Sequence, residues 1–254
     1  MHCRKDGLYL WSMIKDLIKI SLQFIGLLLL AASLSSCDAK KEMATTSSDS
    51  GGFLSLFNGK DLNGWTPAKE NPDSFSVKDG ILVVKGGRSH LFYTGKVNGG
   101  KFKNFELRLK VKTFPGSNSG VYFHTAYQDQ GWPEKGYECQ VNSTHKDPKK
   151  TGSLYGVKNI LVLAEGQKEP PGDNIRRDKS PSSDGEWFDY DITVKDRNIH
   201  IKVNGETTVD YNEPEGGPKT NFTGRRLSEG TFAIQAHDPN SETHYREIQV
   251  KVLD

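Results

Sequence analysis

Short apolar runs that alternate with polar residues recur along the chain from about residue 53. Residues 105–112 alternate strictly, and this period of two predicts an antiparallel strand with one buried face. Residues 187–194 and 199–203 alternate in the same way. Two further apolar runs, 75–77 and 81–84, flank an Asp-Gly turn and predict a hairpin. Other strands are predicted at 53–57, 91–93, 121–124, 137–142, 160–163, 231–237 and 245–253.

No amphipathic segment of helical length follows the N-terminal region. About ten strands separated by turns are typical of an all-β sandwich or barrel. Two antiparallel sheets, one packed on the other, fit the alternation best. Two long segments rich in Gly, Pro and charge, 165–186 and 209–226, are predicted to be loops.

The stretch from Asn118 to Asn142 combines this pattern with reactive side chains. Successive side chains of a strand point to opposite faces. Tyr122 and His124 therefore share one face of the first strand, and Val121 and Phe123 share the other. In the second strand, Glu138, Gln140 and Asn142 oppose an apolar face that includes Cys139. We expect the two polar faces to line one groove and the Cys139 thiol to be a small buried hydrophobic group.

The charge of the chain argues against a nucleic-acid partner. Lys and Arg total 34 against 32 Asp and Glu, for a net charge of +2, and the two signs are interspersed. A nucleic-acid surface would require a basic stripe.

The N-terminus predicts a secreted and anchored protein. Lys15 and Lys19 precede the apolar run 24–32, which is too short for a comfortable membrane span. The sequence Leu-Ser-Ser-Cys that ends at Cys37 resembles a bacterial lipobox, with an ordinary signal peptide as the alternative. The predicted domains are a lipoprotein signal peptide (1–37), a flexible tether (38–52) and one jelly-roll domain (53–254). Lipid on Cys37 would place the protein in the cell envelope, facing the periplasm or the outer membrane, with the membrane as partner through the lipid only.

Four separated motifs carry a family resemblance. They are Leu-Phe-Asn-Gly-Lys-Asp-Leu-Asn-Gly-Trp (56–65), Asn-Ser-Gly-Val (118–121), Gly-Tyr-Glu-Cys-Gln-Val (136–141) and Gly-Thr-Phe-Ala-Ile-Gln-Ala-His-Asp (230–238), followed by Tyr-Arg-Glu-Ile (245–248). In this order they resemble the 3-keto-disaccharide hydrolase family, known from secreted proteins of Bacteroidetes and Planctomycetes. The resemblance implies a concanavalin-A-like jelly roll of two curved antiparallel sheets, with a carbohydrate bound on the concave face.

The chain departs from the commoner form of that family at two positions. His124 stands where the family more often has Arg, and Asn142 stands where it has Asp. The second change weakens any case for a carboxylate-rich metal site. Strand 137–142 also has one carboxylate, which does not support the two-carboxylate mechanism of retaining glycosidases.

Glu138 is the first candidate for a catalytic residue, since partial burial can tune a carboxyl for acid or base work. His124 is the second, because imidazole titrates near neutral pH. The alternative for both is a structural or binding role. The predicted substrate-binding residues are Tyr122, Gln140, Gln235, His237, Tyr155, Lys158 and Trp132. His237 and Asp238 alone do not make a metal site, so no metal is predicted and the cofactor is unknown.

The resemblance implies a chemistry in which a ketone at C3 of a sugar acidifies the C2 proton. Removal of that proton lets the C1 substituent depart, and water then adds. Glu138, His124 and either Lys158 or a metal would serve as base, acid and enolate stabiliser. The alternatives are a carbohydrate-binding jelly roll without catalysis, or a lipoprotein scaffold with a large exposed apolar patch.

Overall fold

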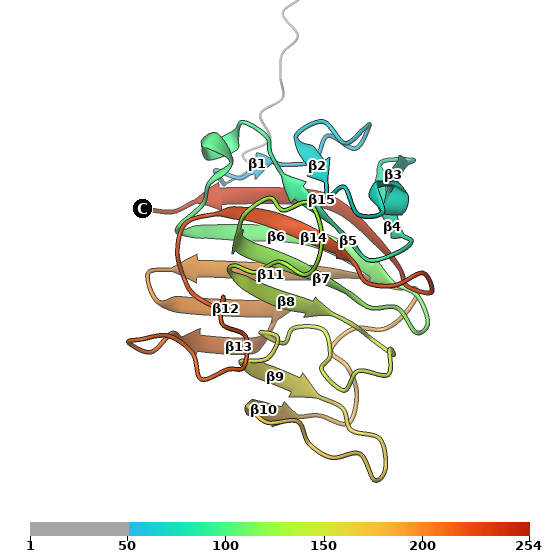
Figure 1. Cartoon of the computed structure of the whole chain (residues 1–254), viewed down its shortest axis with the longest axis vertical. Coiled ribbons are helices and arrows are strands. Elements are labelled where there is room, and N and C mark those ends of the chain that lie inside the picture. Colours follow the sequence, from blue (N-terminus) through green and yellow to red (C-terminus); the bar gives the residue numbers. More distant parts are fainter. Residues whose placement is uncertain (1–50) are drawn as a thin grey trace, which may run out of the picture. The chain divides into compact units, whose positions relative to one another are not determined.

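Two antiparallel sheets packed face to face make up most of the part of the chain that the structure describes (Figure 1). The computed structural model describes residues 51–254, so the predicted signal peptide (1–37), the lipidated Cys37 and nearly all of the predicted tether (38–52) lie outside the described residues. The larger sheet has the order β13 (Glu206–Asn212), β12 (Asn198–Val203), β11 (Trp187–Lys195), β6 (Phe105–Thr113), β15 (Glu242–Val252), β4 (Ile81–Lys85) and β3 (Phe75–Lys78), with β1 (Leu54–Ser55) paired to β15.

The smaller sheet carries the two strands that the sequence pattern singled out. Its order is β2 (Trp65–Pro67), β5 (Ser89–Tyr93), β14 (Thr231–Ala236), β7 (Ser119–Thr125) and β8 (Tyr137–Val141). Beside it, β9 (Lys158–Leu161) and β10 (Asp173–Arg176) form a parallel pair, which the antiparallel expectation did not include. The helical elements of the described residues are two short 3-10 turns, η1 (Pro72–Ser74) and η2 (Val97–Gly100). None of the described helices is long and apolar enough to span a membrane.

The hydrophobic core lies between the two sheets. From the larger sheet it takes side chains such as Leu107 and Ile192, and from the smaller one Phe123, Cys139 and Ile234. Cys139 is fully buried and free, as predicted. The prediction of an all-β, concanavalin-A-like jelly-roll sandwich is confirmed. The remaining face of the smaller sheet, opposite the core, is therefore available for polar groups.

A β-bulge interrupts β7 near its end. Thr125 pairs with Thr231 and Tyr122 pairs with Ala233, so β7 has one residue more than β14 between these two pairs. His124 takes a positive φ of 55° within the bulge. An inserted residue reverses the alternation of side chains beyond it. The prediction that His124 shares a face with Tyr122 is therefore wrong.

The structure also shortens one predicted loop. Residues 206–212 form β13, which pairs with β12 through a hairpin at Asn204 and Gly205. Val209 on this strand is buried in the core. The connection therefore begins at residue 213 and runs to β14. It passes over the outer face of the smaller sheet, where two of its side chains matter below.

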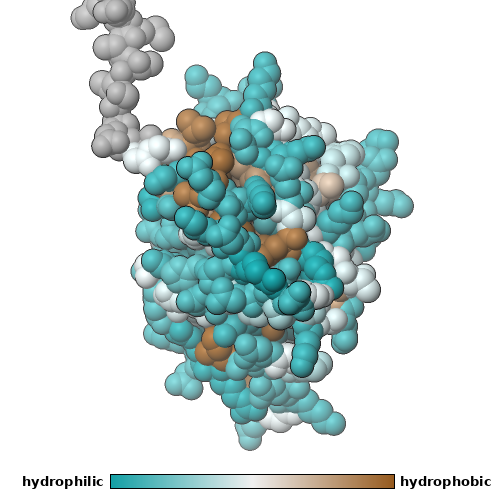
Figure 2. Space-filling model, turned by 90° about the vertical axis from the view of Figure 1, so that its left-hand side faces the viewer, coloured by the Kyte–Doolittle hydropathy of each residue, from teal (hydrophilic) through white to brown (hydrophobic). Residues whose placement is uncertain are grey.

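The surface facing the viewer in Figure 2 is mainly hydrophilic, and its hydrophobic residues fall in small separate groups. Among the described residues the exposed large hydrophobic side chains are Leu54, Tyr127, Trp132, Phe222 and Val252. They come from distant parts of the sequence, and two of them border the pocket described next.

Candidate active site

A pocket of about 360 Å³ opens on the outer face of the smaller sheet. Strands β7, β8 and β14 supply its floor, because alternate residues of each strand point away from the core. Loops before and after β8 and before β14 supply its walls. The lining residues are Asn118, Tyr122, Trp132, Pro133, Glu138, Gln140, Tyr155, Phe222, Arg225, Gln235 and His237.

Glu138 lies at the floor of the pocket and is 5% exposed. Arg225 Nη2 donates to Glu138 Oε2 at 3.1 Å, and Gln235 Nε2 donates to Oε1 at 3.2 Å. The Tyr122 hydroxyl also hydrogen-bonds the carboxyl. Burial raises the pKa of Glu138 above its ordinary value, against the opposing effect of the Arg225 charge and these hydrogen bonds. The carboxyl is therefore held in place and binds protons more readily than an exposed one.

Gly120 makes room for this carboxyl. It lies in β7 next to Glu138's strand, where it pairs with Gln140. A Cβ at position 120 would come within 2.7 Å of Glu138 Oε1 and 3.0 Å of its Cγ. The backbone φ of Gly120 is not positive. Glycine is therefore needed at this position because a side chain would contact the carboxyl, and not because the backbone has a positive φ.

Two buried amide oxygens of the floor have no hydrogen-bond partner among the described residues. They are Gln140 Oε1 and Gln235 Oε1, on side chains that are 1% exposed. Each amide nitrogen is already used: Gln140 Nε2 donates to Asn118 Oδ1, and Gln235 Nε2 donates to Tyr122 Oη. Buried acceptors that lack partners are costly, so they favour a ligand that brings hydroxyl donors.

Aromatic side chains form the rim. Trp132 and Phe222 are each 43% exposed and both line the pocket. The Phe222 ring packs on Tyr155 with a centroid distance of 5.8 Å. Trp132 packs against His237 at 5.3 Å. Exposed aromatic faces next to hydroxyl acceptors are suited to a sugar ring, which has apolar faces and polar edges.

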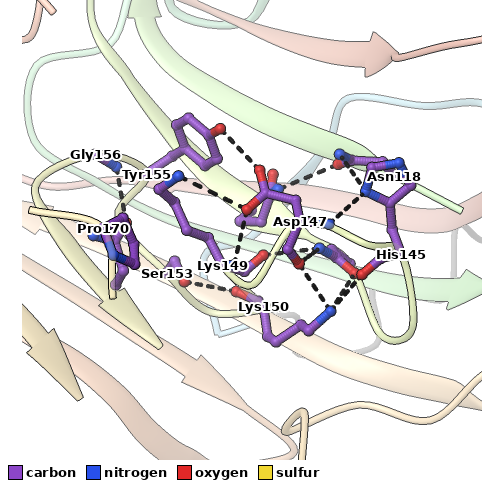
Figure 3. A network of polar contacts seen from close by, with 12 residues as sticks. Asn118, His145, Asp147, Lys149, Lys150, Ser153, Tyr155, Gly156 and Pro170 are labelled. Atoms are coloured by element: carbon purple, nitrogen blue, oxygen red, sulfur yellow. Dashed lines mark hydrogen bonds and ion pairs between the residues drawn. The ribbon is translucent and has the colours of Figure 1, made fainter. Parts of the chain in front are cut away.

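The loop after β8 is held by a buried ammonium group (Figure 3). Lys150 Nζ donates to the carbonyl oxygens of His145 at 2.6 Å and Asp147 at 2.9 Å. Burial lowers the pKa of Lys150. On the same loop, Tyr155 donates its hydroxyl to Asp147 Oδ2 at 2.9 Å. These contacts fix one wall of the pocket and the position of His145.

Three potential metal ligands meet at the edge of the pocket. His145, His237 and Asp238 each offer one ligand atom, and these atoms lie within 4.8 Å of one another. His237 Nδ1 and Asp238 Oδ2 are 2.8 Å apart. The rings of His145 and His237 meet edge to face, with centroids 5.5 Å apart. Only His237 and Asp238 were considered from the sequence, where they did not make a site.

The structure brings seven of the nine predicted site residues together. Glu138, Tyr122, Gln140, Gln235, His237, Tyr155 and Trp132 all line the pocket. Their individual roles stay predictions.

His124 lies elsewhere. It lines a separate cavity together with Lys103 and Ser228. Its Nε2 bonds the Lys103 carbonyl at 2.9 Å and its Nδ1 accepts from Ser228 N–H at 3.1 Å. Burial lowers its pKa to about 4. Because both ring nitrogens are used outside the pocket, His124 is not the partner of Glu138, and its placement in the groove is corrected.

Lys158 also lies outside the pocket. It begins β9 and forms an ion pair with Asp173 at 3.3 Å. The Lys158 ammonium group, which is paired with Asp173, does not line the pocket around Glu138. The prediction that Lys158 contacts the substrate is therefore corrected as well.

Sequence reasoning missed four residues, Arg225, Phe222, Asn118 and His145. Arg225 and Phe222 belong to an irregular loop, whose residues follow no period that would indicate their direction. Asn118 stands in a quoted motif but outside the alternating run. His145 had no signal except its position shortly after β8.

The chain is similar to known proteins over most of its length. A family described as 3-keto-alpha-glucoside-1,2-lyase-like domain matches residues 52–251. A relative from Bacteroides thetaiotaomicron, named 3-keto-disaccharide hydrolase, is 25% identical over 253 residues, covering 81% of this chain and 80% of that protein.

Two crystal structures of candidate glycosyl hydrolases from Parabacteroides distasonis share the fold. One is 22% identical with a TM-score of 0.60 and covers 80% of this chain and 95% of that chain. The other is 23% identical with a TM-score of 0.52 and covers 79% and 99%.

Proposed function

This chain belongs to the family of 3-keto-alpha-glucoside-1,2-lyase-like domains, and from that premise we propose that it cleaves 3-keto-glycosides in the pocket around Glu138. The observation that carries the proposal is the buried carboxyl of Glu138, which lies beside two unpartnered amide oxygens and beneath an aromatic rim. A carboxyl so placed can exchange protons with a bound sugar. The relative named for 3-keto-disaccharides supports the substrate class.

The proposed reaction is an elimination followed by hydration. The Glu138 carboxylate takes the proton from C2, and the C–H electron pair forms an enolate whose negative charge lies on the C3 oxygen. The enolate then expels the C1 oxygen, which takes the proton back from the Glu138 carboxyl and leaves as an alcohol. Water adds across the resulting C1–C2 double bond and gives the free 3-keto-sugar. The sum is one glycoside and one water in, one sugar and one alcohol out.

The environment of Glu138 suits both halves of this transfer. Its raised pKa makes it a better base than an exposed carboxylate and leaves it able to return the proton. Gln140 and Gln235 would accept hydrogen bonds from sugar hydroxyls, and Trp132 and Phe222 would flank the ring. His237 also lines the pocket, and it would lie near the C3 oxygen of the bound sugar.

The test is the variant Glu138→Gln, assayed with 3-ketotrehalose and a 3-keto-glucoside. We expect kcat/KM to fall by about 10²-fold or more, as for loss of a general acid–base group, with substrate binding retained. Glu186→Gln, at an exposed loop position, is the matched control and should keep full activity. Activity of Glu138→Gln within a factor of three of wild type would refute the assignment.

The same assay separates catalysis from binding alone. A carbohydrate-binding module would bind oxidised and unoxidised disaccharides saturably and cleave neither. An enzyme of the proposed type releases product only from the oxidised sugar, because only the ketone acidifies the C2 proton.

We further propose that the protein is anchored in the cell envelope by lipid on Cys37. The lipobox-like sequence and the basic and apolar residues before it support this. Expression in a bacterial host with a labelled fatty acid should label the wild-type chain and not Cys37→Ser. Equal labelling of both would contradict the anchor.

A further inference from the structure

We propose that His145, His237 and Asp238 bind a divalent transition-metal ion at the edge of the pocket. The proposed binding site depends on these three side chains alone. The proposed role of the ion, which is to hold the C3 oxygen of the substrate, rests on the proposed function.

The donor geometry fits an ion with few adjustments. The three ligand atoms lie within 4.8 Å of one another, while metal–nitrogen and metal–oxygen bonds of about 2.0–2.2 Å place ligand atoms of one ion roughly 3–4 Å apart. His237 Nδ1 and Asp238 Oδ2 are already 2.8 Å apart, a separation that two adjacent ligands of one ion can have. An ion that enters there takes the place of the proton between them.

The surroundings hold the ligands in place. Asp238 Oδ2 accepts from Ser241 Oγ at 2.8 Å, and its Oδ1 accepts from Asn240 N–H at 2.9 Å. Second contacts of this kind orient the ligands of metal sites. The backbone at His145 is fixed by the Lys150 ammonium at 2.6 Å.

His145 itself can turn toward an ion at small cost. Its Nδ1 has two contacts, Asp147 N–H at 3.1 Å and Asn118 Nδ2 at 3.3 Å. The first distance lies at the upper end of the usual hydrogen-bond range and the second lies beyond it, so exchanging these contacts for a metal bond gives up little.

The ligand types select the class of ion. Two imidazoles and one carboxylate suit Zn²⁺, Co²⁺, Mn²⁺ or Fe²⁺, whereas Ca²⁺ and Mg²⁺ prefer oxygen ligands throughout. Three protein ligands also leave coordination positions open for a substrate oxygen.

The proposed reaction has a place for such an ion. The enolate formed at C3 needs a positive partner. Arg225 is the one cationic side chain among the residues that line the pocket, and it is paired with Glu138 at 3.1 Å. Lys158 is paired with Asp173 outside the pocket. An ion at His237 would polarise the C3 carbonyl without a proton transfer of its own.

The experiment starts with full-length protein stripped by a chelator. Titration calorimetry with Mn²⁺, Co²⁺ and Zn²⁺ measures binding, and the visible spectrum of the Co²⁺ form reports its ligands. The variants are His145→Ala and Asp238→Asn, and thermal melts verify that each is folded. The matched control is His244→Ala, which removes a His–carboxylate pair of similar length, 2.9 Å to Glu242, that has no third potential ligand among residues 51–254.

We expect one ion per chain, affinity at least tenfold weaker in His145→Ala and Asp238→Asn, and no change in His244→Ala. Absence of stoichiometric binding, or equal loss in the control, would overturn the site. A stripped enzyme that cleaves 3-keto-glycosides at the full rate would overturn the role of the ion and leave the proposed function intact. A protein that binds the ion through His145 but cleaves no 3-keto-glycoside would refute the proposed function and leave the site intact.

Discussion

At the scale of single residues, the ion pair between Glu138 and Arg225 is the central feature of the pocket. Both residues are 5% exposed. A buried ion pair stabilises a fold little, because desolvation offsets the attraction, whereas removal of one partner leaves a costly unpaired charge. The pair is therefore better explained by the chemistry of the pocket than by stability. Burial of the Glu138 carboxyl and the opposing charge of Arg225 together set its proton affinity.

The pH dependence of cleavage should report this balance. Burial raises the pKa of Glu138 above its ordinary 4.5, and the Arg225 charge opposes the rise. We expect kcat/KM to increase with pH through a pKa above 4.5, as the base form appears. Arg225→Met should move this rise in kcat/KM to higher pH, since the opposing charge is gone. Arg226 lines the separate cavity that contains His124, so Arg226→Met should leave the pH dependence unchanged. An unshifted rise in Arg225→Met would contradict the coupling.

Gly120→Ala tests the space around the same carboxyl. The added Cβ would lie 2.7 Å from Glu138 Oε1, so the carboxyl must move. We expect kcat/KM to drop by about 10²-fold, because misplacement of about 1 Å has that effect. The melting temperature should stay within a few degrees, since the φ of Gly120 is not positive and alanine can adopt it. Full activity of the variant would show that the carboxyl need not lie there.

At the scale of elements, the bulge in β7 decides what the sequence could and could not predict. Strict alternation correctly placed Glu138 and Gln140 on β8, and Gln235 and His237 at β14, on one face. The same rule failed at His124 because one inserted residue reverses it, and nothing in the local sequence marks the insertion.

The fold class was more predictable than the site. Many strands each contribute alternation and turn signals, so one irregular strand does not change the architecture. The pocket instead depends on single residues of loops. Arg225 and Phe222 take their directions from tertiary contacts, such as Arg225 with the Gly136 carbonyl at 3.2 Å, that no local pattern contains.

The position of His124 in the bulge also leads to a prediction about the stability of the fold. The pKa of His124 is about 4 in the fold against 6.5 for the free side chain, so the unfolded chain binds the proton more tightly. The free energy of unfolding should therefore fall as pH drops from 6.5 through about 4, by about 3 kcal/mol for this residue. Protonation would set an N–H at Nδ1 against the Ser228 N–H.

Urea unfolding of His124→Gln across this pH range provides the measurement. The variant should show a flatter dependence than wild type, whereas His200→Gln on β12 should follow wild type. A variant curve parallel to wild type would exclude His124 as the source.

At the scale of the whole molecule, the two sheets have separate tasks. The outer face of the smaller sheet carries the pocket. The outer face of the larger sheet carries surface ion pairs, such as Lys110 with Asp189 at 2.6 Å and Arg108 with Asp191 at 3.4 Å. The sandwich core lies between the two faces, so substitutions on the charged face should not reach the pocket.

Lys110→Met tests this separation. Surface pairs contribute about 0–1 kcal/mol, so the free energy of unfolding should change by less than about 1 kcal/mol. The value of kcat/KM should be unchanged. A loss of activity greater than tenfold, with the fold intact, would show that the two faces are coupled.

The position of Cys139 has a practical consequence. It follows Glu138 in β8 but points into the sandwich, fully buried, and it is the one cysteine between residues 51 and 254. A thiol reagent can reach it only when the sheets part. The rate at which such a reagent modifies this sulfur therefore measures how often the two sheets separate. The measurement is made at the residue next to the carboxyl that we assign to catalysis.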